Sequence, residues 1–253
     1  MILSGLDPSG GAGIQADIQA VTALGCHPLP VITCLTVQDT RNVYDAVAVD
    51  ADLIRRQLDC VAADSPIHAI KTGALGNAAV VDALVAFLDK NPHIPLITDP
   101  VIKAAGGGDL ADQALIDAMK HQLFSRADVI TPNGVELAML GDTEDPAEAA
   151  HRLMAAGCRS VLATGGHGDG PNITNTLFSN DGEPIHWHID RVGGEYHGTG
   201  CTLAAAIAAG RACGLSPRTA IAQAQNFVHR AILHSLAVGH GQPVPDRGIR
   251  WEP

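Results

Sequence analysis

Short runs of apolar, often β-branched residues alternate along the chain with longer stretches in which apolar residues recur every three or four positions. The first pattern is typical of buried strands and the second of amphipathic helices, so their alternation predicts βαβ units on a largely parallel sheet. The predicted helices lie near residues 14–24, 53–61 and 80–88, and the predicted strands are residues 1–5, 30–37, 68–71, 95–101, 127–131 and 160–164.

The pattern changes after Thr164. Two short runs of alternating apolar and polar residues flank an Asn-Asp-Gly turn at residues 180–182, which predicts an antiparallel hairpin at an edge of the sheet. Residues 201–213 and 217–236 then predict two closing helices, and the residues after Gly239 are predicted to be irregular.

Length and composition narrow the class of protein. With 253 residues and no repeat or linker-like segment, residues 1–253 are expected to form one α/β domain. A net charge of -11 with 16 Lys and Arg argues against a nucleic-acid surface, because phosphate backbones are bound by clustered cations. The six cysteines form neither a CxxC pair nor a zinc-ligand pattern, which is typical of a reduced protein without disulfides.

The amino-terminal residues and the apolar runs bear on the cellular location. No stretch approaches the roughly 18 to 20 apolar residues of a membrane span, and residues 1–3 are too short an apolar run for a signal peptide. We therefore expect a cytoplasmic protein with no nucleic-acid or membrane partner. Because the first predicted strand is short, we also expect the natural chain to begin a few residues upstream.

Glycine-rich segments follow the predicted strands or precede the predicted helices. In an open parallel sheet, ligands bind at the carboxyl ends of the strands, so these segments are expected to converge on one phosphate or nucleotide site. Any one of them alone is as well explained by a turn, and residues 104–109 alone favour a loop. None has the spacing of a P-loop, a dinucleotide fold or a protein kinase. The five segments are residues 5–13, 72–76, 104–109, 164–170 and 198–200.

The segment EYHGTGC, at residues 195–201, directly precedes a small-residue helix. Gly198 and Gly200 permit a sharp turn, and the N–H groups at a helix start attract anions. The alternative is a turn that merely lets the helix pack closely. Cys201 is a candidate nucleophile or a member of the anion hole, and a helix start is expected to lower its thiol pKa.

Two further pairs of polar residues could bind a metal ion. Asn133 and Glu136, three apart, would share a helix face and could offer oxygens to Mg²⁺. The more common meaning of such a pair is a helix cap with an acidic first turn. His186 and His188 alternate on a predicted strand and could bind a metal in principle, but a solvent-facing strand is the favoured interpretation.

Six motifs occur together in one order: GLDPSGGAGIQADI, LTVQDT, TDPV, ITPNGVE, TGGH and HGTGCTLAAAIAA. In these, the chain resembles the hydroxymethylpyrimidine/phosphomethylpyrimidine kinases of thiamine biosynthesis, from Ile2 to about Gly239. The resemblance implies a ribokinase-like α/β/α sandwich with a mostly parallel sheet and an antiparallel hairpin at one edge. It also implies a pyrimidine substrate, ATP, Mg²⁺ and a homodimer.

The resemblance implies roles for individual residues. The amide of Gln38 would read the amino and ring-nitrogen edge of the pyrimidine, because an amide offers both a donor and an acceptor. Cys201 stands where many ribokinase relatives carry an aspartate base. The implied pocket residues are Gly5, Ala12, Asp17, Gln38, Ala74 and Val101, with Asp7 at the mouth; the magnesium and phosphate residues Asp99, Asn133 and Glu136; the nucleotide residues Asn133, Thr164, Gly165, Gly166, His167 and Val192; and the anion hole Gly198, Thr199, Gly200 and Cys201.

The chain departs from the family pattern at three places. Residues 105–107, Ala-Gly-Gly, stand where the family commonly has Lys-Ser-Gly, and Lys103 is the nearby lysine. Thr164 replaces a usual lysine, and Ala74 replaces a methionine of the pocket wall. The loss of two cations puts the second phosphorylation in question.

Two other functions remain open at this point. A pyridoxal or pyridoxine kinase shares the fold and the chemistry, and the smaller Ala74 enlarges the pocket towards such substrates. A non-catalytic pyrimidine-binding or regulatory relative, inactive without its lysines, is the alternative from another class. Gln38 and Cys201 favour the pyrimidine kinase.

Overall fold

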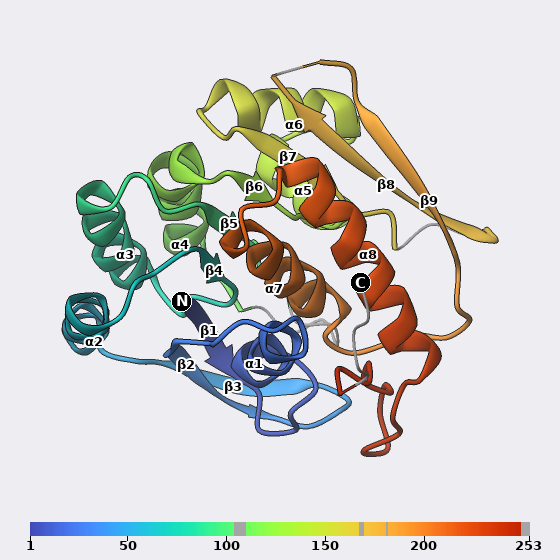
Figure 1. Cartoon of the computed structure of the whole chain (residues 1–253), viewed down its shortest axis with the longest axis horizontal. Helices are drawn as coiled ribbons and strands as arrows, with labels where there is room; N and C mark the ends of the chain where they lie inside the picture. Colours follow the sequence, from blue (N-terminus) through green and yellow to red (C-terminus); the bar gives the residue numbers. More distant parts are fainter. Residues whose placement is uncertain (104–109, 167–169, 181, 249–253) are drawn as a thin grey trace.

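The computed structural model describes residues 1–103, 110–166, 170–180 and 182–248, and the strands within them form a single sheet. The strand order across the sheet is β3-β2-β1-β4-β5-β6-β7-β8-β9 (Figure 1). The strands are β1 (Ile2–Leu6), β2 (Pro30–Gln38), β3 (Val43–Ala48), β4 (Ile70–Thr72), β5 (Leu96–Thr98), β6 (Val129–Ile130), β7 (Ser160–Ala163), β8 (Asn172–Ser179) and β9 (Ile185–Asp190).

The centre of the sheet is parallel and its two margins are antiparallel. The strands from β2 through β1, β4, β5 and β6 to β7 pair in parallel, which confirms the βαβ prediction. The predicted hairpin is present as β8 and β9, although Asp181 of its turn lies outside the described residues. β3, antiparallel to β2 at the opposite edge, is not among the predicted strands, because its residues are mostly exposed and lack a buried face.

Helices fill the connections, and several begin at residues suited to capping. The side chains of Asp50, Asn77 and Ser216 accept hydrogen bonds from backbone N–H groups at the starts of α2, α3 and α8. No helix in the described parts of the chain is long and apolar enough to cross a membrane. The helices are α1 (Gly13–Ala23), α2 (Ala51–Asp64), α3 (Ala78–Lys90), α4 (Gln113–Ala118), α5 (Gly134–Gly141), α6 (Pro146–Ala155), α7 (Thr199–Ala212) and α8 (Pro217–Leu233), and short π and 3-10 turns follow α4 at Met119–Leu123 and Phe124–Arg126.

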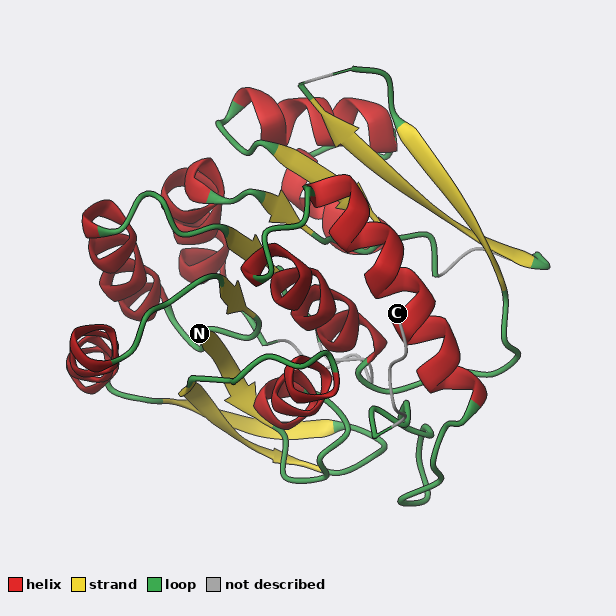
Figure 2. Ribbon diagram, viewed as in Figure 1, coloured by secondary structure: helices red, strands yellow, loops and turns green. Residues whose placement is uncertain are grey.

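Two hydrophobic cores lie on opposite faces of the sheet, as the alternation of side chains along a strand requires. Leu3 and Leu96 pack with α2 to α6, whereas their neighbours Ile2 and Ile97 pack with α1, α7 and α8. Figure 2 shows the resulting three layers, with the strands between two groups of helices. The chain is therefore an α/β/α sandwich of the expected kind.

The last two helices pack unusually closely. All but one of the buried residues 204–209 of α7 are alanine, and a Cβ built on Gly210 would lie only 2.9 Å from Ala220 Cβ of α8. This close packing fixes α7 against the centre of the sheet, where it contacts β4 and β5. The amino end of α7 is thereby held at the carboxyl ends of these strands.

Candidate active site

The glycine loop after β1 is shaped by a buried carboxylate. Asp7 Oδ1 accepts hydrogen bonds from the backbone N–H and hydroxyl of Ser9 at 2.8 and 2.7 Å, and Oδ2 accepts from the N–H of Ala12 at 2.8 Å. Burial disfavours the charged form, but hydrogen bonds from His197 and Ser9 outweigh it and hold the pKa of Asp7 below its ordinary value. Asp7 therefore acts on the loop as an ionised internal cap.

His197 joins this loop to the end of β2. Its Nε2 lies 2.8 Å from Asp7 Oδ2 and 3.1 Å from the amide nitrogen of Gln38. The amide oxygen of Gln38 is 3.1 Å from Thr36 Oγ1. Two predicted pocket residues, Asp7 and Gln38, are thus brought together by a residue to which sequence analysis gave no role.

Gly5 completes this side of the site. A Cβ at Gly5 would lie 2.6 Å from Cys34 Sγ and 3.5 Å from Ala74 Cβ, so only glycine fits between these side chains. Five predicted pocket residues therefore surround the carboxyl ends of β1, β2 and β4: Gly5, Asp7, Ala12, Gln38 and Ala74.

An ion pair is buried behind this surface. Lys71, the middle residue of the short strand β4, places its Nζ 2.8 Å from Asp17 Oδ2 of α1, and both side chains are 0% exposed. Asp17 is therefore part of the buried base of the site. Burial opposes the charge on Lys71, but the neighbouring Asp17, Cys201 and Asp99 raise its pKa above the ordinary value.

The turn before α7 has the geometry expected of a glycine-dependent helix start. Gly198 is the N-cap of α7 and has a φ of 85°, in the left-handed region that favours glycine. A Cβ at Gly200 would lie 3.8 Å from Asp99 Oδ2, so the acid at the end of β5 lies beside this turn. Thr199 and Cys201 belong to the first turn of α7, whose N–H groups can meet an anion.

The thiol of Cys201 does not have the lowered pKa expected from its helix position. Its withdrawal from water raises its pKa to about 12, and Asp99 and Asp17 raise it further, against the opposing effects of Lys71 and the backbone of Gly13. Burial likewise raises the pKa of Asp99 to about 6, although a hydrogen bond with Cys201 opposes this. The expectation of a depressed thiol pKa is wrong, because burial and the carboxyl groups outweigh the helix start.

Asn133 and Glu136 form a reciprocal cap at the start of α5. Asn133 Oδ1 accepts from the Glu136 N–H, and Glu136 Oε2 accepts from the Asn133 N–H, both at 3.0 Å. Glu136 Oε1 also lies 3.4 Å from the N–H of Ile102. Burial, followed by the charge of Asp99, raises the pKa of Glu136 to about 8. The interpretation of Asn133 and Glu136 as a helix cap is therefore correct. The carboxyl groups of Glu136 and Asp99 also repel each other electrostatically.

This arrangement fits a magnesium ion carried by a nucleotide. Among the described residues no set of three or more His, Cys, Asp or Glu side chains is placed to hold a metal by itself. Mg²⁺ usually takes only one or two protein carboxylates and completes its coordination with phosphates and water. Asp99 and Glu136 offer such a pair, and a bound cation would offset the charge of Asp99, which after burial is the second cause of the raised pKa of Glu136.

The predicted nucleotide residues lie beyond this pair, around β7. Thr164 bridges to Asn133, and its hydroxyl donates to Pro132 O at 3.3 Å. The N–H of Gly165 donates to Asn175 Oδ1 at 3.0 Å, and the carbonyl of Gly166 accepts from Arg191 at 3.0 Å.

The remaining predicted residues have different outcomes. Val101 and Val192 are half-buried, Val101 directly after Asp99 and Pro100 and Val192 after β9 at the far edge of the sheet. His167 and residues 105–107 lie outside the described residues. His186 and His188 are exposed and contact Thr176 and Thr174 on the neighbouring strand, which confirms the solvent-facing interpretation.

Three residues of the site were missed by sequence analysis. Lys71 follows the apolar residues of a predicted strand, and a lysine in a buried strand is a signal that could have identified it. His197 is the first residue of the motif HGTGCTLAAAIAA. Arg247 belongs to the tail that was predicted to be irregular. Its guanidinium donates to Thr202 Oγ1 at 2.8 Å and to Gly11 O at 2.6 Å, so it ties the glycine loop to α7. Nothing in the local pattern signals such a long-range contact.

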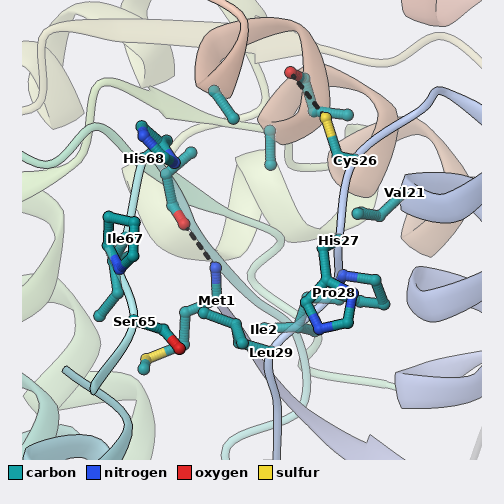
Figure 3. A pocket seen from close by; sticks show the side chains of 15 residues that line it. Met1, Ile2, Val21, Cys26, His27, Pro28, Leu29, Ser65, Ile67 and His68 are labelled. Carbon is teal, nitrogen blue, oxygen red and sulfur yellow. Dashed lines mark hydrogen bonds between the residues drawn. The ribbon is translucent and has the colours of Figure 1, made fainter. Parts of the chain in front are cut away.

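A cavity of about 390 Å³ lies elsewhere, at the amino ends of β1 and β4. Its lining includes Met1, Cys26, Pro28 and His68, and Figure 3 shows the amino group of Met1 directed at a backbone carbonyl, which belongs to Ala69. None of the predicted site residues lines it. It is therefore separate from the candidate active site at the opposite ends of the strands.

Comparison with known proteins gives a consistent result. Residues 7–245 match the family model described as phosphomethylpyrimidine kinase. The hydroxymethylpyrimidine/phosphomethylpyrimidine kinase of Escherichia coli is 34% identical over 249 residues, which are 95% of this chain and 94% of that protein. The thiamine biosynthesis bifunctional protein ThiED of Geobacter sulfurreducens is 38% identical over 95% of this chain. The chain spans 50% of that protein and about half of such bifunctional relatives.

Solved structures agree on the fold. An ADP complex of Bacillus subtilis pyridoxal kinase superposes with a TM-score of 0.88 at 26% identity, covering 98% of this chain and 96% of that one. The phosphomethylpyrimidine kinase of Clostridium difficile superposes with a TM-score of 0.78 at 28% identity, covering 91% and 97%. Arg247 lies just outside the residues matched by the family model.

Proposed function

We infer a function from the premise that this chain belongs to the phosphomethylpyrimidine kinase family. It is proposed to be a one-domain kinase that transfers the γ-phosphoryl group of ATP to the hydroxyl of 4-amino-5-hydroxymethyl-2-methylpyrimidine, and then to the monophosphate. The observation that carries this proposal is that His197, the first residue of the HGTGC turn, contacts both Asp7 and Gln38 at one end of the sheet. The cytoplasm is the proposed location, and all six cysteines are free thiols there.

In the proposed mechanism, the pyrimidine lies against Gly5, Ala12 and Ala74, with its amino edge on Gln38. Gly5 leaves room for close approach of the ring to the backbone. Gln38 offers one donor and one acceptor to the polar edge of the ring. Val101, half-buried after β5, would close the pocket from the other side.

The transferred phosphoryl group would lie at the N–H groups of Gly198 to Cys201. Charge spreads over the equatorial oxygens of the phosphoryl group during transfer, and a fixed set of N–H donors stabilises it without rearrangement. Thr164, Gly165, Gly166, His167 and Val192 are proposed to hold the rest of the nucleotide, with Asn133 at its phosphate end.

Cys201 is the proposed acceptor of the hydroxyl proton, because its sulfur stands in the first turn of the helix that would hold the phosphoryl group. The pKa of this thiol is raised to about 12, so the thiol must first release its own proton to solvent and can accept the hydroxyl proton only as the thiolate. Magnesium, when bound at Asp99 and Glu136, would supply positive charge that offsets one of the carboxyl groups raising this pKa. Lys71 acts in the same direction from beneath.

Pyridoxal phosphorylation is the second candidate activity. Pyridoxal kinases are the structures with a TM-score of 0.88, and Ala74 leaves more space than the methionine common in the family. Steady-state turnover of the aminopyrimidine and of pyridoxal, measured side by side with MgATP, distinguishes the two. The proposed function requires the higher kcat/KM with the pyrimidine, and a preference for pyridoxal would reverse the assignment.

Replacing Gln38 with leucine is expected to weaken pyrimidine binding and leave nucleotide binding unchanged. Leucine has a similar size but leaves the polar edge of the ring unpaired, which costs about 1 to 3 kcal/mol. Calorimetric titration with the pyrimidine and with a non-hydrolysable ATP analogue measures both affinities. An unchanged pyrimidine affinity would show that Gln38 does not contact the ring.

We also propose that the chain forms a homodimer through the β2–β3 edge of the sheet. Leu35 and Val47 are paired across the two strands and are 49% and 60% exposed, and Val37 nearby is 59% exposed. Adjacent exposed apolar side chains on an edge strand are a common interaction surface. A second copy of this chain is the proposed occupant.

Val47→Glu is expected to convert this dimer into a monomer, because a charge would be buried opposite the partner's apolar side chains. Light scattering coupled to gel filtration measures the mass. Val135→Glu, at another exposed valine on α5, is the matched control and should leave the mass unchanged. A monomeric wild-type chain, or a Val47→Glu dimer, would contradict this interface.

A further inference from the structure

A short chain of polar groups crosses the substrate side of the site. Asp7 Oδ2 and His197 Nε2 are 2.8 Å apart, and His197 Nε2 and the amide nitrogen of Gln38 are 3.1 Å apart. The amide oxygen of Gln38 is 3.1 Å from Thr36 Oγ1, and that hydroxyl donates to Leu6 O at 2.8 Å. The side chain of Asp7 is 3% exposed and that of His197 is 11% exposed, so the contact between them is shielded from water.

The protons in this row of hydrogen-bonded groups can be assigned from its two ends, Asp7 and Leu6 O. Asp7 is ionised and only accepts, so the proton of the imidazole must lie on His197 Nε2. Leu6 O also only accepts, so the single hydroxyl proton of Thr36 points to it and the Thr36 oxygen is left as an acceptor. The amide of Gln38 therefore faces a donor on the His197 side and an acceptor on the Thr36 side.

Only one orientation of the amide satisfies both neighbours. With the amide nitrogen towards His197, two donors face each other, and the Thr36 hydroxyl would have to donate twice. Turning the amide by 180° places Oε1 at the His197 N–H and the NH₂ group at Thr36 Oγ1, and every contact becomes donor to acceptor. The His197 proton is then shared between Asp7 Oδ2 and Gln38 Oε1, a three-centre arrangement that proteins commonly use.

The geometry points to His197 as the positioning residue that fixes the orientation of the Gln38 amide for reading an aminopyrimidine edge. In that orientation Gln38 keeps one free N–H and one free lone pair on Oε1. A ring edge with an exocyclic amino group next to a ring nitrogen presents the complementary acceptor and donor. His197 acts through Gln38 and does not itself contact the reacting atoms.

The position of the imidazole is itself fixed by packing. The backbone N–H of His197 donates to Pro243 O at 2.9 Å, which fixes the main chain that carries the ring. A Cβ on Gly11 would collide with His197 Cδ2, and it would lie 2.9 Å from Val244 Cγ1. The glycine loop and the tail residues thus hold the ring between them, which is the arrangement expected of a group that orients another.

The test compares two substitutions of nearly equal size and opposite chemistry. His197→Gln retains an N–H donor at the end of the side chain, and His197→Met removes it. Titration calorimetry with 4-amino-5-hydroxymethyl-2-methylpyrimidine is expected to show binding weakened about tenfold in His197→Met, the size of effect typical of one lost hydrogen bond, and largely restored in His197→Gln. Affinity for a non-hydrolysable ATP analogue should be unchanged in both variants.

Two further measurements keep the result decisive. In a Gln38→Leu background, His197→Met should cause no additional loss, because its effect passes through the amide. If His197→Met does not fold, Thr36→Val removes the hydroxyl oxygen that accepts from the Gln38 amide, and it should weaken pyrimidine binding in the same way. Equal pyrimidine affinities in the Met and Gln variants, or additive losses with Gln38→Leu, would overturn the positioning role.

This inference rests on the proposed function, and the same titration separates the two. If the wild-type chain does not bind the aminopyrimidine, the proposed function fails and this inference fails with it. If the wild-type chain binds and the His197 variants do not differ from each other, the function stands and the positioning role alone is wrong.

Discussion

Replacing Cys201 with serine is expected to lower the turnover of the aminopyrimidine about 100-fold or more, within the range that one general base contributes. A serine hydroxyl is a far weaker acid than a thiol, so in the same buried place it accepts a proton only when its own alkoxide forms. The N–H groups at the start of α7 are unchanged by this swap, and KM for both substrates should stay within about threefold.

The control for this measurement is Cys60→Ser. Cys60 is exposed on α2, on the other face of the sheet from α7, and its replacement should leave turnover unchanged. Single-turnover kinetics separate the phosphoryl transfer from product release. A Cys201→Ser variant that retains most of the wild-type rate would show that Cys201 only supports the anion hole.

Replacing Lys71 with methionine is expected to destabilise the folded chain by ~3 to 5 kcal/mol, because Asp17 would remain as a buried charge without its partner. The expected loss is large since both side chains are 0% exposed and Asp99 adds a second carboxyl group nearby. Turnover should fall as well, because the loss of Lys71 raises the pKa of the Cys201 thiol still further.

Urea unfolding followed by circular dichroism measures the loss in the free energy of unfolding, and two further variants serve as comparisons. Arg55→Met breaks an ion pair with Asp52 in which the side chains are 52% and 61% exposed, and it should leave the free energy of unfolding nearly unchanged, because water screens the pair. The double variant Lys71→Met/Asp17→Leu removes both charges and should be more stable than Lys71→Met alone. Equal losses in Lys71→Met and Arg55→Met would contradict the buried ion pair.

The parallel centre of the sheet was predictable because its strands are apolar on both faces. Strands such as β5 and β6 lie between two helix layers, and continuous apolar runs are the direct consequence. β3 was not predictable in this way, since it covers no helix and most of its side chains are exposed. The short helix α4 was missed for a different reason, because it has only six residues before the π and 3-10 turns begin.

The site was predictable where a local motif carries the geometry. The turn at Gly198 and the cap at Asn133 and Glu136 depend on residues close in sequence, and both are present. The thiol pKa of Cys201 was predicted with the wrong sign, because its burial, together with carboxyl groups that follow β5 and lie on α1, depends on segments far away in sequence. Arg247 depends on an equally distant contact, with Gly11.

The proposed activity of this chain is the phosphorylation of an aminopyrimidine alcohol at the site formed around the HGTGC turn. It is tested most directly by incubating the purified chain with 4-amino-5-hydroxymethyl-2-methylpyrimidine and ATP and identifying the products by mass spectrometry. We expect the monophosphate and then the diphosphate with Mg²⁺ present, neither product when the metal is chelated, and strongly reduced formation in Cys201→Ala. The absence of any phosphorylated pyrimidine at saturating MgATP would contradict it.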